Sequence, residues 1–135
     1  DQTAIQYAQK LSPDDYMNQK FWYDDQIADR DYLANASDQE LAKKSEIKED
    51  YKARKIWYEE QLQAKEYLAS VADKDLLQIS QESHPDDLHM QKVFYTRQLP
   101  AKVYMDGVPS SPEKDELQSR YPGDYSKQRL IHSHR

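Results

Sequence analysis

The sequence predicts an all-α protein, and three observations support that prediction. A segment of twenty residues recurs along the chain, its apolar residues follow helical spacing, and acidic residues gather where helices would begin. Glycine, the usual residue after a helix end, is absent before Gly107. We expect a domain over residues 1–105, made of three helical repeats of about 35 residues in a bundle or short solenoid. An extended, partly helical C-terminal arm is expected over residues 106–135.

The repeated segment is clearest in its first two copies. Residues 14–33 and 49–68 are identical at eight of twenty positions, including Trp22 and Trp57. A weaker third copy over residues 86–105 has Phe94 in the tryptophan position. The offsets of 35 and 37 residues are typical of helical-hairpin repeats.

The starts of the repeated helices are predicted from capping residues. Ser12 and Pro13 suit the N-cap and the first helical position, and Pro85 suggests a similar start for the third copy, after Ser83 or His84. Pro100 is expected to end the third helix early.

The segments between the copies predict shorter helices. Residues 37–45 open with Ser37 and Glu40 at the spacing of a capping box, and residues 72–80 follow the second copy in the same way. These segments are short connecting helices or continuations of the long ones, and one helix over about residues 46–82 is the alternative. In the arm, Ser111 and Pro112 predict one short helix that ends near Arg120.

Apolar residues of the first copy fall on three stripes, whereas an ordinary surface helix has one. Contact on several sides is therefore expected, either within the chain or partly with another protein. Lysine stems at Lys20 and Lys55 are expected to cover ring faces, and Gln26 and Gln61 to bind tyrosine hydroxyls.

The bulky aromatic residues are the candidate protein-binding residues. The repeated rings suit packing seams, and aromatic side chains are also favoured anchors at interfaces. The candidates are Trp22, Tyr23, Trp57, Tyr58, Phe94 and Tyr95 in the repeats, with Tyr121 and Tyr125 in the arm.

Composition and motifs argue against several other classes of function. The net charge of −6 disfavours nucleic acid, and no apolar run is long enough for a transmembrane segment. The two glycines cannot build a phosphate-binding loop, and there is no cysteine. Two pairs of residues have a spacing that could suit a metal ion, but each pair supplies too few ligands for a site: Asp86 with His89, and His132 with His134. We therefore expect no enzyme activity and no cofactor, and a small-molecule ligand is not expected.

The sequence favours a non-catalytic structural or accessory subunit. Such a subunit would dock on neighbouring proteins of a larger complex through the aromatic helix seams and the C-terminal arm. The alternative is a free-standing secreted or periplasmic helical module that binds a protein or peptide. A first residue other than methionine suggests a processed chain, as in organellar, periplasmic or secreted proteins, or a trimmed one; the compartment itself is not predicted.

Overall fold

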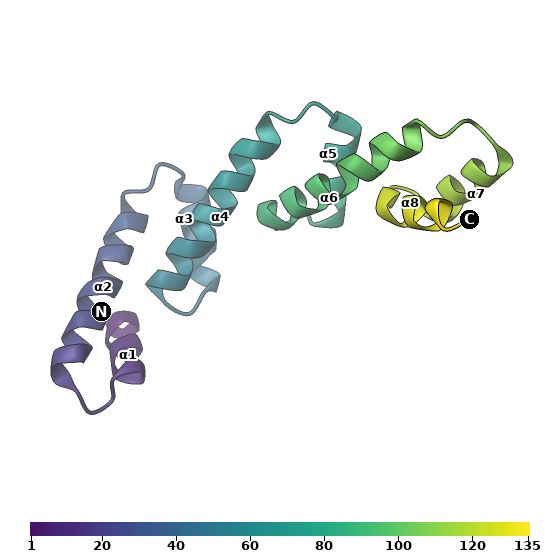
Figure 1. Cartoon of the computed structure of the whole chain (residues 1–135). Coiled ribbons are helices and arrows are strands. Elements are labelled where there is room, and N and C mark those ends of the chain that lie inside the picture. Colours follow the sequence, from purple (N-terminus) through teal and green to yellow (C-terminus); the bar gives the residue numbers. More distant parts are fainter. The chain divides into compact units, whose positions relative to one another are not determined.

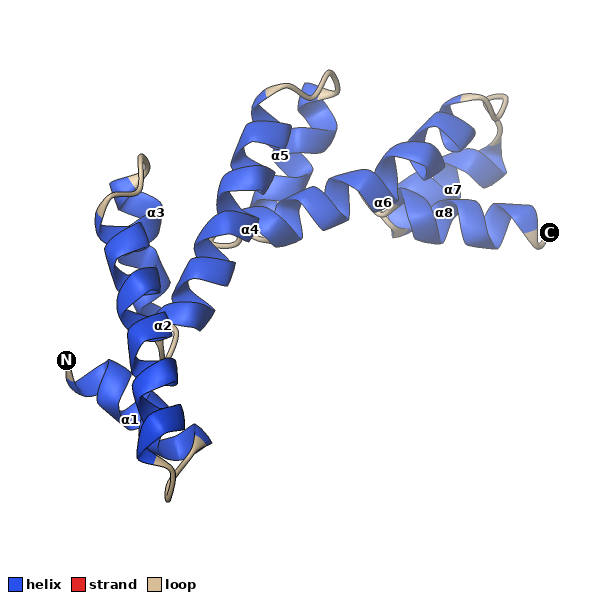
Figure 2. Cartoon of the chain, turned by 60° about the vertical axis from the view of Figure 1, so that its left-hand side comes forward, coloured by secondary structure: helices blue, strands red, loops and turns tan.

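The computed structural model describes all 135 residues and consists of helices joined by loops, without strands (Figure 1, Figure 2). The all-α prediction is confirmed. One 3₁₀ turn, Ser45–Ile47, follows the third helix. The α-helices are α1 (Gln2–Leu11), α2 (Tyr16–Ala34), α3 (Gln39–Lys44), α4 (Tyr51–Ala69), α5 (Lys74–Ser83), α6 (Leu88–Asp106), α7 (Pro112–Arg120) and α8 (Tyr125–Ser133).

Short and long helices alternate along most of the chain. Helices α2, α4 and α6 have 19 residues each, and each begins two residues after the start of a copy of the repeated segment and ends one residue after its end. A shorter helix precedes each of them, and Figure 1 shows α1 beside α2 and α5 beside α6.

Helices α2, α6 and α8 begin at aspartate N-caps. The Asp15 carboxylate accepts hydrogen bonds from two N–H groups in the first turn of α2, and Asp87 and Asp124 cap α6 and α8. Ser12 instead ends α1, so the prediction that Ser12 caps the next helix is wrong. A carboxylate accepts hydrogen bonds from the free N–H groups of the first turn, and its negative charge is stabilised by the positive end of the helix dipole.

The connecting segments form separate helices. Helix α4 ends at Ala69 and α5 begins at Lys74, so a single helix over residues 46–82 does not form. Asp73 caps α5, and Asp38 rather than Ser37 caps α3.

Pro100 lies inside α6, and the helix continues to Asp106. The prediction that it ends the helix is wrong. Proline removes one N–H donor and crowds the carbonyl four residues earlier. Pro100 is exposed, so water can hydrogen-bond the carbonyl that loses its partner, and the flanking turns keep their packing.

The C-terminal thirty residues contain a fourth pair of helices, α7 and α8. The predicted helix from Pro112 to Arg120 is confirmed as α7, but α8 follows it, so the expectation of an extended arm is wrong. Gly123 joins the two helices with a φ of 75°, a left-handed conformation that glycine adopts without strain. A Cβ atom there would also lie 3.3 Å from the side chain of Ile79.

The chain divides into two compact units, Asp1–Gln63 and Ala64–Arg135, and the division falls within α4. In the first unit the buried apolar residues are Ala4, Ala8, Leu33, Leu41, Ala42 and Tyr58. In the second unit a buried cluster of Leu68, Val71, Leu76 and Tyr95 is surrounded by half-buried apolar residues from α4, α5, α6 and α8.

Candidate protein-interaction surface

The long helices can be compared residue by residue from their first turns. We call the residues Asp15, Asp50, Asp87 and Asp124 the cap aspartates, because each immediately precedes α2, α4, α6 or α8. Counting from the cap aspartate gives every residue of a long helix an equivalent in the next. Helix α8 is shorter than the other three but follows the same count.

The residues seven positions after the cap aspartate are the predicted anchors Trp22, Trp57 and Phe94, and each is half-buried. Trp22 has Tyr7 and Phe21 against it in edge-to-face contacts, with ring centroids 6.3 and 5.0 Å away. Contacts inside their own units therefore take up part of these ring surfaces. Their role in binding a partner stays a prediction.

The next position holds the tyrosines Tyr23, Tyr58 and Tyr95. Tyr58 is 1% exposed and Tyr95 is 2% exposed. Their hydroxyls accept hydrogen bonds at 3.2 Å from the backbone N–H groups of Asp38 and Asp73, which are the N-caps of α3 and α5. These two tyrosines hold a short helix against the long helix that follows it, and their rings are out of reach of a partner. Tyr23 is half-buried.

Tyr121 and Tyr125, the candidates near the C-terminus, are also half-buried. The Lys127 ammonium lies 4.5 Å from the Tyr121 ring centroid, and the Lys102 ammonium lies 5.7 Å from that of Tyr125. Contact of these rings with another protein stays a prediction.

Lys102 also connects two helices of the second unit. Its ammonium lies 2.6 Å from a carboxylate oxygen of Asp73. The hydrogen bond from Lys102 lowers the pKa of the Asp73 carboxyl, and the same bond raises the pKa of Lys102. The pair joins the start of α5 to α6.

Glutamines eleven positions after the cap aspartate connect one long helix to the start of the next. Gln26 is 0% exposed; its amide nitrogen donates to Asp50 at 3.2 Å, and its amide oxygen accepts from the N–H of Tyr51 at 2.9 Å. Gln98 donates to Asp124 at 3.4 Å and accepts from the N–H of Ser126 at 2.9 Å, one residue further into the helix than the bond from Tyr51. For Gln26, the predicted tyrosine hydroxyl partner is wrong: the amide reaches a helix N-terminus instead.

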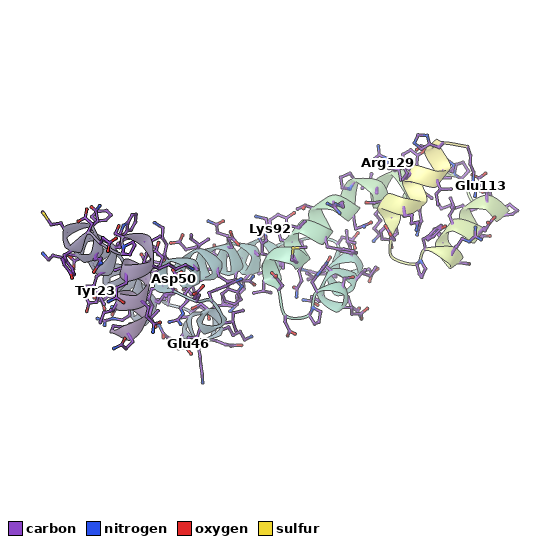
Figure 3. All side chains as sticks on the ribbon, turned by 90° about the horizontal axis from the view of Figure 1, so that it is seen from below. Tyr23, Glu46, Asp50, Lys92, Glu113 and Arg129 are labelled. Carbon is purple, nitrogen blue, oxygen red and sulfur yellow. The ribbon has the colours of Figure 1, made fainter.

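Cations five positions after the cap aspartate cover tyrosine rings of the preceding long helix. The Lys55 ammonium lies 4.6 Å from the Tyr32 ring centroid, and the Lys92 ammonium lies 5.1 Å from that of Tyr67. The guanidinium of Arg129 lies 4.9 Å from the Tyr104 ring centroid. Figure 3 labels Lys92 on α6 and Arg129 on α8, the second-unit members of this series. The expectation that Lys55 covers a ring is confirmed, whereas Lys20 contacts none.

The same tyrosines meet a second ring edge-on. Tyr32 pairs with Tyr58 at a centroid distance of 6.1 Å, and Tyr67 pairs with Tyr95 at 6.2 Å. The third pair, between Tyr104 and His132, is 5.6 Å apart, and the Tyr104 hydroxyl lies 2.8 Å from Nδ1 of His132. We call the glutamine bonds to the start of the next long helix the glutamine clamp. The clamp, the covering cation and the edge-on ring together are the hairpin contact set.

Asp29 is a buried carboxylate beside this contact set. Burial raises the pKa of the Asp29 carboxyl, while Lys55, 3.5 Å away, acts in the opposite direction. The unfolded chain thus loses the Asp29 proton at a lower pH than the folded chain. This group therefore makes folding less favourable as the pH rises from about 4 through the folded pKa.

The substitution Asp29→Asn should remove that pH dependence. We expect the free energy of unfolding of the variant to rise relative to wild type between about pH 3 and pH 7, because asparagine carries no charge to bury. Urea unfolding at the two pH values measures the change. Asp24→Asn, at an exposed position of the same helix, is the control. If the free energy of unfolding of the variant instead falls relative to wild type as the pH rises, the ion pair with Lys55 outweighs the cost of burial.

An apolar residue lies six positions after each cap aspartate, a feature that the sequence prediction did not include. Phe21 is 62% exposed, Ile56 is 50% exposed and Leu130 is 58% exposed, while Val93 is half-buried. We call these four residues the apolar row. The aligned copies do show an apolar residue at this position. The prediction of binding residues instead used the bulkier tryptophan and tyrosine that follow it.

The structure shows no group of three or more histidine, cysteine, aspartate or glutamate side chains placed to hold a metal ion. None of the helices combines the length and the apolar character of a membrane-spanning segment.

The sequence matches no family model, and no curated protein or solved structure is similar enough to count as a match. The fold and the surface described above therefore carry the functional argument alone.

Proposed function

We propose that this protein is a non-catalytic structural or accessory subunit that docks on neighbouring proteins of a larger complex. The apolar row carries this proposal. Single exposed apolar residues are normal on any protein surface. A helix position that is apolar in four successive hairpins, and exposed in three of them, is different because the solvent face of a helix is ordinarily polar.

The row supplies two apolar side chains to each unit, Phe21 and Ile56 in the first and Val93 and Leu130 in the second. Water around such side chains is released when a partner covers them, which favours association. The aromatic seams are largely engaged inside the chain, and the C-terminal residues are helical. The row therefore takes the docking role first expected of the seams and an extended arm.

The distribution of charge between the two units indicates which partner surface would complement this protein. Residues 1–63 contain fourteen acidic and nine basic side chains, whereas residues 64–135 contain eleven and ten. The net negative charge of −6 thus lies mainly on the first unit. A partner surface with an apolar centre and a basic rim would complement Phe21 and Ile56, and opposite charges would speed the encounter.

The double substitution of Phe21→Gln and Ile56→Gln tests the proposal. Native purification of the tagged 135-residue chain, followed by mass spectrometry, should recover a partner at fixed stoichiometry with wild type. We expect at least about a tenfold lower recovery with the variant, because the proposal makes both side chains hot spots at the centre of the interface, where truncation costs more than about 1 kcal/mol. Ala28→Gln with Gln63→Ala, at exposed positions of the same helices, is the matched control and should retain the partner.

A second candidate is a free-standing module that binds an acidic peptide. A cavity of about 540 Å³ in the first unit favours it, because Arg30, Lys43 and Arg54 are among the residues that line it. Recovery of a monomeric chain with no stoichiometric partner would contradict the subunit proposal. Binding of a labelled acidic peptide that Lys43→Gln weakens would then support the module.

A further inference from the structure

We infer that the cavity beside α3 binds a phosphate monoester, with Arg54 and Lys43 as its main ligands. The cavity has a volume of about 540 Å³ and lies in the first unit. Its cations are best understood by comparing the hairpins α1–α2, α3–α4, α5–α6 and α7–α8. The site is independent of the apolar row and of the subunit proposal, since neither Phe21 nor Ile56 lines the cavity.

Arg54 takes the place of a glutamine that the other three hairpins share. Four positions after the cap aspartate, the amides of Gln19, Gln91 and Gln128 each donate at 2.7 Å to the carbonyl that ends the preceding short helix. The Nε atom of Arg54 makes the matching bond, 2.9 Å to the carbonyl of Lys48. The two terminal nitrogens of the guanidinium are therefore not needed for this structural bond, and they make no other hydrogen bond or ion pair.

Tyr51 holds the Arg54 guanidinium in place. The guanidinium carbon lies 4.9 Å from the Tyr51 ring centroid, and the Tyr51 hydroxyl is fixed by a bond of 2.5 Å to the carboxylate of Asp1. A guanidinium presents its donors as a planar fork, which matches two oxygen atoms of a phosphate or carboxylate group. Stacking on the ring leaves less side-chain freedom to lose when such a group binds.

Lys43 is the second cation that the other hairpins lack. It lies five positions after the N-cap of α3, where α1 and α5 have Gln6 and Gln78 and α7 has Glu116. Lys43 is exposed and makes no ion pair, whereas its neighbour Lys44 has one within α3. Neither cation lies in a phosphate-binding sequence motif, so a small ligand was not expected from the sequence.

The charge of the lining favours a phosphate monoester over a carboxylate. Arg30, Lys43 and Arg54 oppose one carboxylate, Glu46, and three cations against one anion leave a net charge of +2 (Figure 3 labels Glu46). Arg30 also pairs with Asp31 at 3.1 Å, so Arg54 and Lys43 are the free ligands. A phosphate monoester carries about −1.5 to −2 charges at pH 7, which matches this lining, whereas one carboxylate carries about −1.

The rest of the lining indicates an apolar or aromatic group on the ligand. Leu33, Ala34 and Ala42 form the apolar part of the cavity wall. The Gln39 amide nitrogen donates to three backbone carbonyls, and the Ser45 hydroxyl donates to the carbonyl of Ala42. These donors are already engaged, so the cations are left to bind the phosphate and the apolar wall is left for the group that carries it.

Titration of the 135-residue chain with phenyl phosphate tests the inference, with NMR of the backbone amides as the readout. We expect chemical-shift changes over residues 39–54, and at least about tenfold weaker binding of benzoate, which has the same ring but about half the charge. Absence of shifts at about 10 mM phenyl phosphate, where a site of millimolar affinity is occupied, would overturn the inference. Equal affinity for benzoate would overturn it as well.

The variant Arg54→Gln introduces the residue of the other three hairpins, which should still donate to the Lys48 carbonyl. We expect a urea midpoint near that of wild type and at least about tenfold weaker binding of phenyl phosphate. Lys43→Gln, at an exposed position, should weaken binding in the same way even if Arg54→Gln does not fold. Lys44→Gln is the matched control. Binding that survives both cavity variants, or that the control weakens equally, would contradict the site.

Two peptide titrations identify the source of the phosphate and separate this inference from the acidic-peptide module. A phosphotyrosine peptide carries the same phenyl phosphate group. Tighter binding of that peptide than of phenyl phosphate assigns the group to a partner protein, and no gain assigns it to a small ligand; both results support the site. If an acidic peptide without phosphate binds as tightly as the phosphotyrosine peptide, the inference fails while the module proposal stands.

Discussion

Replacing Tyr95 with alanine is expected to lower the free energy of unfolding by about 3–5 kcal/mol, the range for losing a large buried aromatic ring. The ring is 2% exposed and lies in the cluster with Leu68, Val71 and Leu76. Its edge-to-face contact with Tyr67 and its hydroxyl bond to the N-cap of α5 are lost as well. One substitution thus loosens α4, α5 and α6 together.

Two further variants separate the contributions. Tyr95→Phe keeps the ring and removes only the hydroxyl that accepts from Asp73, so we expect a loss of about 0.5–1.5 kcal/mol. Tyr16→Ala removes a tyrosine that is 84% exposed and should change stability by less than about 0.5 kcal/mol.

The measurement must resolve the two compact units, since they need not unfold in one step. Urea unfolding combined with hydrogen exchange does so, and the loss for Tyr95→Ala should appear in amides of residues 64–135. A loss below about 1 kcal/mol would show that the cluster packs loosely enough to fill the space left by the ring.

The sequence was sufficient to predict helices wherever a repeated pattern coincided with capping chemistry. Helices α2, α4 and α6 follow from the recurring tryptophan or phenylalanine and tyrosine, and α7 follows from Ser111 and Pro112. The exact N-caps did not follow, because serine, proline and aspartate stand together before α2. Which of them caps the helix depends on where the turn from α1 ends.

Helix α8 was not predicted, because its segment lacks the tryptophan or phenylalanine and the tyrosine by which the earlier copies were aligned. Ile131 and His132 stand where the earlier copies have tryptophan or phenylalanine followed by tyrosine. The polar part of the pattern is nevertheless present, with Asp124 as the N-cap, and with Gln128 and Arg129 at the positions of Gln91 and Lys92. The hydrogen bonds confirm the equivalence: the amides of Gln91 and Gln128 each donate, at 2.7 Å, to the carbonyl that ends the preceding short helix.

For the contacts between hairpins, the sequence predicts which types of residue take part but not which residue each of them contacts. Lysine over tyrosine was expected for Lys55, yet nothing in one helix shows which ring lies beneath it. The ring that lies beneath the lysine depends on how two long helices are aligned, and the residues in contact are more than twenty positions apart. The packing of the short helix between them sets this alignment. Gln26 was predicted to bind a tyrosine hydroxyl for the same reason, although the hydroxyls of Tyr58 and Tyr95 bind the N-caps of α3 and α5.

The substitution Gln26→Glu tests this clamp with almost no change of shape. Glutamate keeps an acceptor for the N–H of Tyr51 but loses the donor to Asp50 and places a second carboxylate beside it. We expect a loss of about 3–5 kcal/mol at pH 7, as for a buried charge without a partner, against about 1–3 kcal/mol for Gln26→Leu, which loses the bonds without adding charge. Gln63→Glu, exposed on α4, should stay within about 0.5 kcal/mol of wild type.

The pH dependence of Gln26→Glu follows from the same contact. Burial and the neighbouring Asp50 would raise the pKa of the new carboxyl in the folded chain, so the variant loses stability relative to wild type as the pH rises from about 4. Below that pH the group is protonated in both states, and its hydroxyl can donate to Asp50 as the amide does. Urea unfolding at about pH 4 and pH 7 measures the recovery. Equal stability of the glutamate and leucine variants at pH 7 would mean that water reaches the clamp, and the buried connection between α2 and α4 would have to be abandoned.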